Sequence, residues 1–190
     1  MAINVVALLV ALVAGSIPFS WLLGYFRYGV DLRTVGDHHV GSGNLLHVGG
    51  MPAVLAATVL DLLKGAAAVA IATAITSDEW VVITAGVLVV VGHVFPPWLS
   101  FKGGRGAAPA IGVAWALFPL AGLAMLGVGL VALLTMRRTV PAIAAAVVAL
   151  VVVAYFADGD LSRLLFSVLL FISAGVKDVI DRLLARRAGG

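Results

Sequence analysis

Residues 92–106 read Gly92-His93-Val94-Phe95-Pro96-Pro97-Trp98-Leu99-Ser100-Phe101-Lys102-Gly103-Gly104-Arg105-Gly106, and their cationic part separates two uncharged stretches, Trp80–Phe101 and Gly106–Met136. Gly103, Gly104 and Gly106 let the backbone turn tightly and direct N–H groups at one point, and Lys102 and Arg105 add positive charge there. The segment predicts either a phosphate-binding loop at the edge of a membrane or a positively charged turn that only fixes topology.

The composition identifies the class of protein. Of 190 residues, 63% are hydrophobic and 11% are charged, and the mean hydropathy is +1.17. A soluble domain cannot bury so much apolar surface, so the sequence predicts a polytopic α-helical membrane protein. The net charge of +3 is too small to indicate a nucleic acid partner, and the absence of cysteine excludes disulfides, a thiol nucleophile and thiolate metal sites.

The chain has no linker, low-complexity segment or obvious internal repeat, so we expect residues 1–190 to form one integral-membrane domain. The opening apolar run continues through Phe26 without a basic segment before it, which favours a retained first span over a cleaved signal peptide.

Uncharged runs predict helices near residues 2–25, 50–75, 80–99, 140–157 and 161–185. The stretch Gly106–Met136 decides the number of spans. As one helix it would measure roughly 46 Å, which is too long for a hydrocarbon core of about 30 Å. Phe118-Pro119 near its middle offers a break into two short helices, and this gives seven spans.

The distribution of cations supports seven spans with the N-terminus outside and the C-terminus cytoplasmic. In that arrangement only Arg163 lies outside, together with Asp78, Glu79, Asp158 and Asp160. With six spans the cations divide almost evenly. The seven-span arrangement places these cations on the cytoplasmic side: Arg27, Arg33, Lys102, Arg105, Arg137, Arg138, Lys177, Arg182, Arg186 and Arg187.

The loops that could perform chemistry therefore all face the cytoplasm, which suits an enzyme of cytosolic substrates better than a transporter. Asp61 and Lys64 lie three residues apart on one face of the second span, far from its cytoplasmic start. An ionisable pair at such depth lines a cavity, contacts a substrate or forms a structural ion pair. The alternative hypothesis is a small transporter that uses Asp61 and Lys64, and it predicts a substrate flux across the membrane that depends on Lys64.

Histidines gather in the first cytoplasmic loop, which runs from about Arg27 to Gly50 and lacks helical periodicity. His38, His39 and His47 lie near Asp31 and Asp37, but their irregular spacing does not predict a metal site. A solvated histidine and a general base at His39 or His47 both remain open. His93, at the end of the third span, is either a structural histidine or a substrate contact.

At this point the chain resembles a known family, the small bacterial integral-membrane acyl-phosphate:glycerol-3-phosphate acyltransferases. The resemblance covers most of the chain and is most specific in residues 92–106. The matching residues are Gly15-Ser16-Ile17-Pro18-Phe19, Asp31-Leu32-Arg33 with Gly36, Gly41 and Asn44, Asp61-Leu62-Leu63-Lys64-Gly65, Gly92-His93-Val94-Phe95-Pro96, and Phe101-Lys102-Gly103-Gly104-Arg105-Gly106.

The resemblance implies transfer of a fatty acyl group from acyl phosphate to glycerol 3-phosphate in phospholipid synthesis, without a cofactor or a metal. It implies a multi-pass protein of the bacterial plasma membrane whose acyl chain lies in an apolar groove. It also implies these substrate-binding residues: Arg33, Gly41, Asn44, Lys64, His93, Lys102, Gly103, Gly104, Arg105 and Gly106.

The chain differs from the family pattern at the positions tied to chemistry. Asp37 replaces a serine and His47 replaces an arginine, and these two are the candidate catalytic residues. In the last span, Val176 and Val179 stand where the family has histidine and asparagine. The alternatives are therefore an inactive paralogue that binds phosphate or lipid in a regulatory role, or an acyltransferase with another acceptor.

Overall fold

The structure, a computed structural model, describes residues 2–36, 38–157 and 159–188. Every regular element in these residues is a helix, as the composition predicts. The elements are α1 (Ala2–Gly15), α2 (Phe19–Leu22), the π-helical turn η1 (Leu23–Arg27), the 3-10 turn η2 (Leu32–Thr34), α3 (Ser42–Ile75), α4 (Glu79–Val94), the 3-10 turn η3 (Pro97–Leu99), α5 (Ala107–Leu117), α6 (Pro119–Met136), α7 (Thr139–Ala157) and α8 (Leu161–Ala188).

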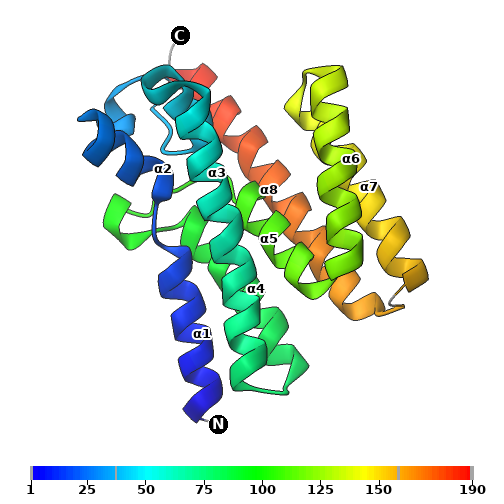
Figure 1. The fold of residues 1–190 in the computed structure, drawn as a ribbon. Coiled ribbons are helices and arrows are strands. Elements are labelled where there is room, and N and C mark those ends of the chain that lie inside the picture. Colours follow the sequence, from blue (N-terminus) through cyan, green and yellow to red (C-terminus); the bar gives the residue numbers. More distant parts are fainter. Residues whose placement is uncertain (1, 37, 158, 189–190) are drawn as a thin grey trace.

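The helices form a bundle with α3, α4, α5 and α8 near its middle (Figure 1). Helix α1 packs against α4 and α3, helix α3 packs against α5, and α6 pairs with α7 at one side. The start of α1 and the end of α8 lie at opposite ends of the molecule (Figure 1). The first loop, between η1 and α3, lies at the same end as the C-terminal part of α8.

Small residues bring the central helices into backbone contact. A side chain at Gly65 in α3 would collide with the carbonyl group of Pro109, and one at Gly112 in α5 would collide with that of Leu62. Helices in a lipid environment associate through close packing of this kind because water provides no hydrophobic driving force there. The same type of contact joins α1 to α4, where Gly15 lies against the backbone of Val89.

Three helix boundaries differ from the sequence-based expectation. The first apolar run is not one helix over 2–25. It breaks at residues 16–18, of which the last is Pro18, and continues as α2 and η1. The first loop is shorter than expected, since α3 already begins at Ser42 and bends at Gly50, where φ is +67°. The third predicted helix ends at Val94 instead of residue 99.

The break at Phe118 is confirmed, because α5 ends at Leu117 and α6 starts with Pro119. Among the described residues, three helical segments are long and apolar enough to cross a membrane: Ser42–Ile75, Glu79–Leu99 (α4 taken together with η3) and Pro119–Met136. The bent pair Ala2–Gly15 and Phe19–Arg27, with an angle of 41° between its parts, adds a fourth. Helix α5 is shorter, with 11 residues.

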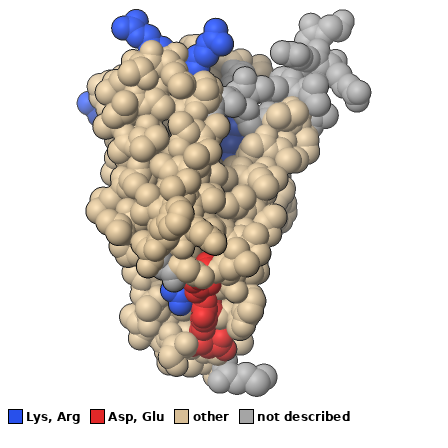
Figure 2. All heavy atoms as spheres, turned by 90° about the vertical axis from the view of Figure 1, so that its right-hand side faces the viewer, with Lys and Arg blue, Asp and Glu red and all other residues tan. Residues whose placement is uncertain are grey.

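Charged side chains gather at the two ends of the bundle. Figure 2 shows Asp and Glu side chains towards one end, with a cationic side chain beside them, and Lys and Arg side chains at the other end. At the acidic end, Arg163 Nε lies 2.8 Å from Glu79 Oε1 and 3.1 Å from Asp160 Oδ2. This network joins the start of α4 to the start of α8.

Candidate active site

Lys64 lies at the centre of a buried polar cluster. Its side chain and that of Asp61 are each only 5% exposed, and Lys64 Nζ lies 2.8 Å from Asp61 Oδ1. Lys64 Nζ also donates a hydrogen bond to the carbonyl oxygen of Ile17 at 2.7 Å and contacts Nδ1 of His93 at 3.0 Å. The ammonium group therefore contacts a carboxylate of its own helix, a carbonyl oxygen in the break after α1 and the ring of His93 in α4, which is the arrangement of an internal ion pair.

The break between α1 and α2 supplies one of these acceptors. Because the helix is interrupted between Gly15 and Phe19, the carbonyl oxygen of Ile17 lies outside a continuous helix and is available to a side chain. Next to it, Ser16 Oγ accepts a hydrogen bond from Trp98 Nε1 at 2.8 Å and donates one to the carbonyl oxygen of Val13. The break thus connects α3 on one side with the segment after α4 on the other.

His93 connects this buried cluster to the glycine-rich turn. The Gly104 N–H donates to the carbonyl oxygen of His93 at 3.1 Å, and the Gly103 N–H donates to that of Val94 at 3.0 Å. A Cβ atom at Gly104 would collide with the imidazole ring, with Nε2 nearest, and one at Gly103 would collide with the His93 carbonyl group. Both positions therefore require glycine because the turn lies directly on the end of α4.

The N–H groups of Gly103 and Gly104 are not available to a ligand, since carbonyl groups at the end of α4 already accept them. The nearby backbone donors are instead the N–H groups of Ala107 and Ala108 at the start of α5, because Pro109 has no N–H and the Ala110 N–H donates to the carbonyl oxygen of Gly106. Gly106, with φ +89°, is the N-terminal cap residue of α5 and provides no side-chain cap. A helix start of this kind attracts an anion, and exposed Lys102 and half-buried Arg105 precede it.

The connection between α4 and α5 lies part way along α3 instead of beyond its end (Figure 1). Helix α4 has 16 residues and α5 has 11, so neither extends the full height of the bundle. Lys64 lies roughly 20 Å along α3 from the bend at Gly50. The turn and the deep lysine meet because the two short helices let the connection enter the bundle. Ser100 and Phe101 within it adopt positive φ values of 54° and 62°.

Asn44 organises the first loop. It is 2% exposed, and its amide nitrogen donates to the carbonyl oxygens of Leu32 at 2.8 Å, Val35 at 2.9 Å and His39 at 3.0 Å. Two N–H groups serve three acceptors, so one of the donors is shared. Gly36 lies against the Asn44 side chain, with φ +57°. The loop is thus folded around one asparagine at the start of α3.

Arg33 is held by its neighbours in the same loop. Its Nε lies 3.0 Å from Asp31 Oδ1, its Nη2 lies 2.6 Å from Asp31 Oδ2, and its guanidinium group lies 5.8 Å from the ring centre of Trp21. Trp21 Nε1 also donates to Asp31 Oδ1 at 3.0 Å. The hydrogen bonds from Arg33 hold the pKa of Asp31 well below its usual range, and the same pairing raises the pKa of Arg33.

The remaining predicted residues of the first loop have different surroundings. The Gly41 N–H donates to Nδ1 of His39 at 3.0 Å, so this position serves the local turn. His47 is exposed on the first part of α3 and faces Gly36. The other candidate catalytic residue, Asp37, lies outside the described residues.

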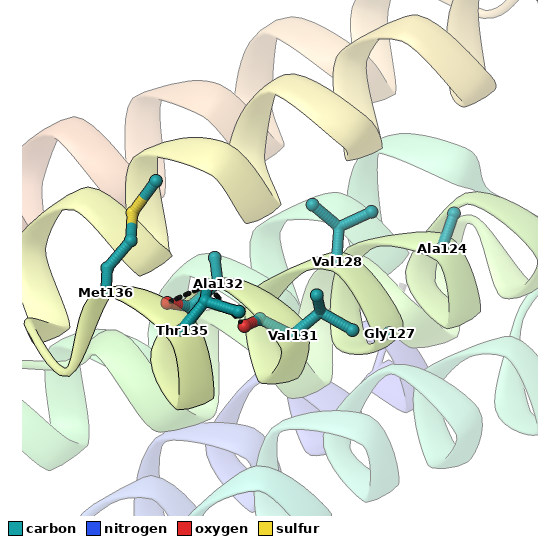
Figure 3. A pocket seen from close by; sticks show the side chains of 7 residues that line it. All are labelled: Ala124, Gly127, Val128, Val131, Ala132, Thr135 and Met136. Carbon is teal, nitrogen blue, oxygen red and sulfur yellow. Dashed lines mark hydrogen bonds between the residues drawn. The ribbon is translucent and has the colours of Figure 1, made fainter.

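Two apolar grooves open on the surface. One of about 580 Å³ runs along one face of α6 (Figure 3). Its one hydroxyl group, on Thr135, bonds back to the carbonyl oxygens of Val131 and Ala132, so the groove is apolar throughout. The other, of about 400 Å³, is lined by Phe19, Leu22, Leu23, Phe26, Arg27 and Leu60. The Phe19 ring lies 5.4 Å from Lys64 Nζ, so this second groove adjoins the buried cluster.

The predicted site residues thus fall into two groups. One group comes together inside the bundle and consists of Lys64, His93, Gly103 and Gly104. The same turn also carries Lys102, Arg105 and Gly106. Arg33, Gly41, Asn44 and His47 belong to the first loop and the start of α3. Residue spacing does not reveal the supporting contacts of Ile17 and Trp98, because their partners lie 47 and 82 residues away.

A helical membrane bundle with a cationic, glycine-containing turn at a helix start defines an integral-membrane protein equipped to bind an anionic substrate. The sequence matches the family described as "Glycerol-3-phosphate acyltransferase" over residues 5–186, and the chain belongs to this family. Relatives named glycerol-3-phosphate acyltransferase include one from Synechococcus elongatus, 38% identical over 146 residues, which are 72% of this chain and 70% of that protein.

A second relative, glycerol-3-phosphate acyltransferase 1 of Dehalococcoides mccartyi, is 35% identical over 182 residues, with 92% of this chain and 87% of that protein covered. The structure is similar to the crystal structure of PlsY, an integral membrane glycerol 3-phosphate acyltransferase, in its glycerol 3-phosphate form. The TM-score is 0.82 at 30% identity, and the match covers 97% of this chain and 93% of that chain.

Proposed function

We propose that this protein transfers a fatty acyl group from acyl phosphate to the 1-hydroxyl group of glycerol 3-phosphate. The hydroxyl oxygen attacks the acyl carbonyl carbon, a C–O ester bond forms, and the bond between that carbon and the phosphate oxygen breaks. The phosphate leaves with the electron pair, and the hydroxyl proton passes to a base. The products are lysophosphatidate and phosphate. Membership of the acyltransferase family supports the reaction.

The observation that carries the proposal is the turn at residues 102–106. Two glycines seated on the end of α4 place Lys102 and Arg105 at the start of α5, where the N–H groups of Ala107 and Ala108 have no acceptor within the helix. Oriented N–H groups and two cations suit the charge of a phosphate group. We assign a phosphate-binding role to Lys102, Gly103, Gly104, Arg105 and Gly106, with the two glycines shaping the turn.

The first loop supplies the remaining groups for the acceptor. Arg33, already oriented by Asp31, provides a third cation, and Gly41 and Asn44 maintain the loop. Asp37 and His47 occupy the positions at which the resemblance places catalytic residues, and we propose that His47 accepts the hydroxyl proton. An acyl phosphate is already activated, so positioning and charge neutralisation suffice, without a metal or a covalent intermediate.

The groove lined by Phe19 and Leu60 is the proposed site of the acyl chain. Its apolar walls suit a hydrocarbon, and Phe19, which lines it, also lies beside the buried Lys64. The chain would then approach the turn from the lipid side, while glycerol 3-phosphate arrives from water. The groove along α6 is equally apolar but is lined by α6 alone.

We further propose seven membrane spans in one domain of the bacterial plasma membrane, with the N-terminus outside and the site cytoplasmic. Seven helical segments correspond to these spans. They are α1 through η1 taken together, α3, α4, α5, α6, α7 and α8. The one-sided distribution of cations in the sequence supports this orientation.

The test is an assay of the detergent-solubilised protein with palmitoyl phosphate and glycerol 3-phosphate, following phosphate release and lipid product together. We expect lysophosphatidate from the wild type, and a rise of about 10-fold or more in KM for glycerol 3-phosphate in Lys102→Ala, since a charge-assisted hydrogen bond contributes about 1.5–3 kcal/mol. Arg138→Ala removes an exposed cation outside the turn and is the matched control.

Product formation that is equal in wild type and Lys102→Ala would contradict the role of the turn. Phosphate release without lysophosphatidate would contradict glycerol 3-phosphate as the acceptor. Absence of both, in protein that still binds glycerol 3-phosphate, would identify the inactive paralogue.

A further inference from the structure

His93 makes an unusual hydrogen bond in the middle of the bundle. Its Nδ1 atom lies 3.0 Å from Lys64 Nζ and 3.4 Å from Asp61 Oδ1, and its side chain is 11% exposed. A lysine and a histidine at this distance would repel each other if both were cations. One of the two must therefore donate the hydrogen bond and the other must accept it. The identity of the donor in this contact decides which ring nitrogen carries the proton.

The geometry identifies Lys64 as the donor. An ammonium group has three N–H donors and no acceptor, so it can only donate to Nδ1. The Asp61 carboxylate, with Oδ1 at 2.8 Å from Lys64 Nζ, favours the charged form of the lysine. That oxygen makes no hydrogen bond of standard geometry among the described residues, so Nδ1 does not donate to it and the contact at 3.4 Å is electrostatic. Nδ1 is therefore an acceptor, and a neutral imidazole with an acceptor at Nδ1 carries its proton at Nε2.

The Nε2 edge of the ring faces the glycine turn. Nε2 is the atom that a Cβ at Gly104 would meet first. The N–H groups of Gly103 and Gly104 are occupied by α4 carbonyl groups, so these two glycines present no backbone donor beside the ring. A proton at Nε2 thus supplies a hydrogen-bond donor beside Gly103 and Gly104, whose own N–H groups are bonded to α4.

We propose that Asp61 and Lys64 are positioning residues that hold His93 as a neutral imidazole protonated at Nε2, and that this N–H group donates a hydrogen bond to phosphate bound at the turn. Lys64 then acts on the reaction through His93 and does not touch the substrate. The proposal deepens the proposed function, on which the identity of the phosphate ligand rests.

The first experiment observes the tautomer directly, without an activity assay. The purified full chain is labelled with ¹⁵N at its histidines, of which there are four, and His93→Gln identifies the resonances of residue 93. We expect a protonated Nε2 and an unprotonated Nδ1 in the wild type. Lys64→Met removes the donor and should mix the two tautomers, whereas Lys102→Met, on the exposed part of the turn, should leave the tautomer unchanged. A wild-type ring protonated at Nδ1 would overturn the proposal.

The second experiment distinguishes donation to phosphate from simple support of Lys64. A glutamine side chain can place an N–H group near the position of Nε2, while an asparagine can place an acceptor near Nδ1. We expect His93→Gln to retain at least about 10-fold more kcat/KM than His93→Asn. The opposite order would mean that His93 serves only to hold Lys64, and it would overturn the donor role.

A titration separates this proposal from the proposed reaction. Glycerol 3-phosphate, and separately inorganic phosphate, is added to the labelled protein without an acyl donor. We expect the Nε2 resonance to shift with glycerol 3-phosphate while Nδ1 keeps its value. If the resonance shifts but no acyl donor gives product, the proposed reaction fails and the donor role stands. If catalysis occurs but Nε2 does not respond, the donor role fails.

Discussion

The imidazole ring of His93 occupies the space that a side chain at Gly104 would need. The two residues are joined a second time through the backbone, since the Gly104 N–H donates to the His93 carbonyl oxygen at 3.1 Å. The end of α4 and the cationic turn are therefore one structural unit. A change in either residue should alter the other.

Gly104→Ala should lower both stability and activity. The new methyl group must displace the His93 ring, and such overpacking costs about 1–3 kcal/mol. We expect a lower Tm and a higher KM for glycerol 3-phosphate, measured by thermal unfolding and by product formation. Gly127→Ala, in α6, is the matched control because a Cβ there meets nothing within 4 Å. An unchanged KM in Gly104→Ala would show that the turn accommodates a side chain.

Asn44→Asp should loosen the first loop while leaving the rest of the bundle intact. A carboxylate cannot donate to the carbonyl oxygens of Leu32, Val35 and His39, and it would repel them. We expect amide hydrogen exchange in residues 32–41 to accelerate by about 10-fold or more, since an unsatisfied buried group costs about 1–3 kcal/mol. Exchange in α4 serves as the internal reference. Equal acceleration in both regions would indicate global destabilisation instead.

Asp31 should remain ionised in moderately acidic solution. Its pKa in the folded protein lies below the unfolded value of about 3.9, so its pairing with Arg33 stabilises the loop above that pH and is lost only as pH falls through the lower folded pKa. The carboxyl ¹³C resonance of Asp31 should therefore stay constant between about pH 7 and pH 4. In Arg33→Gln the resonance should titrate near the usual value. Titration of Asp31 near pH 4 in the wild type would refute the pairing.

The proposed topology predicts which positions are accessible from outside. The chain contains no cysteine, so single cysteines can be introduced without a background. Ser77→Cys and Gly159→Cys should react with a membrane-impermeant maleimide in intact cells. Gly43→Cys and Arg138→Cys should react only after the membrane is opened. Labelling of Arg138→Cys in intact cells would contradict seven spans, because it would place the turn between α6 and α7 outside.

The sequence by itself determined the class of protein, the break before Pro119, the cationic glycine turn and the family. These are local or compositional properties. A backbone in lipid must satisfy its polar groups within each helix, so long apolar runs become helices whatever their neighbours are. Proline and glycine interrupt those helices through their own geometry, which is also visible in the sequence.

Only the tertiary structure decided which polar groups meet. Lys64 and His93 are 29 residues apart, and Trp98 and Ser16 are 82 apart, so no spacing rule connects them. Their contacts depend on how closely the helices approach, which small residues such as Gly65 and Gly112 allow. Packing likewise used the Gly103 and Gly104 N–H groups for α4 instead of a ligand, because a turn seated on a helix end bonds to its free carbonyl groups first.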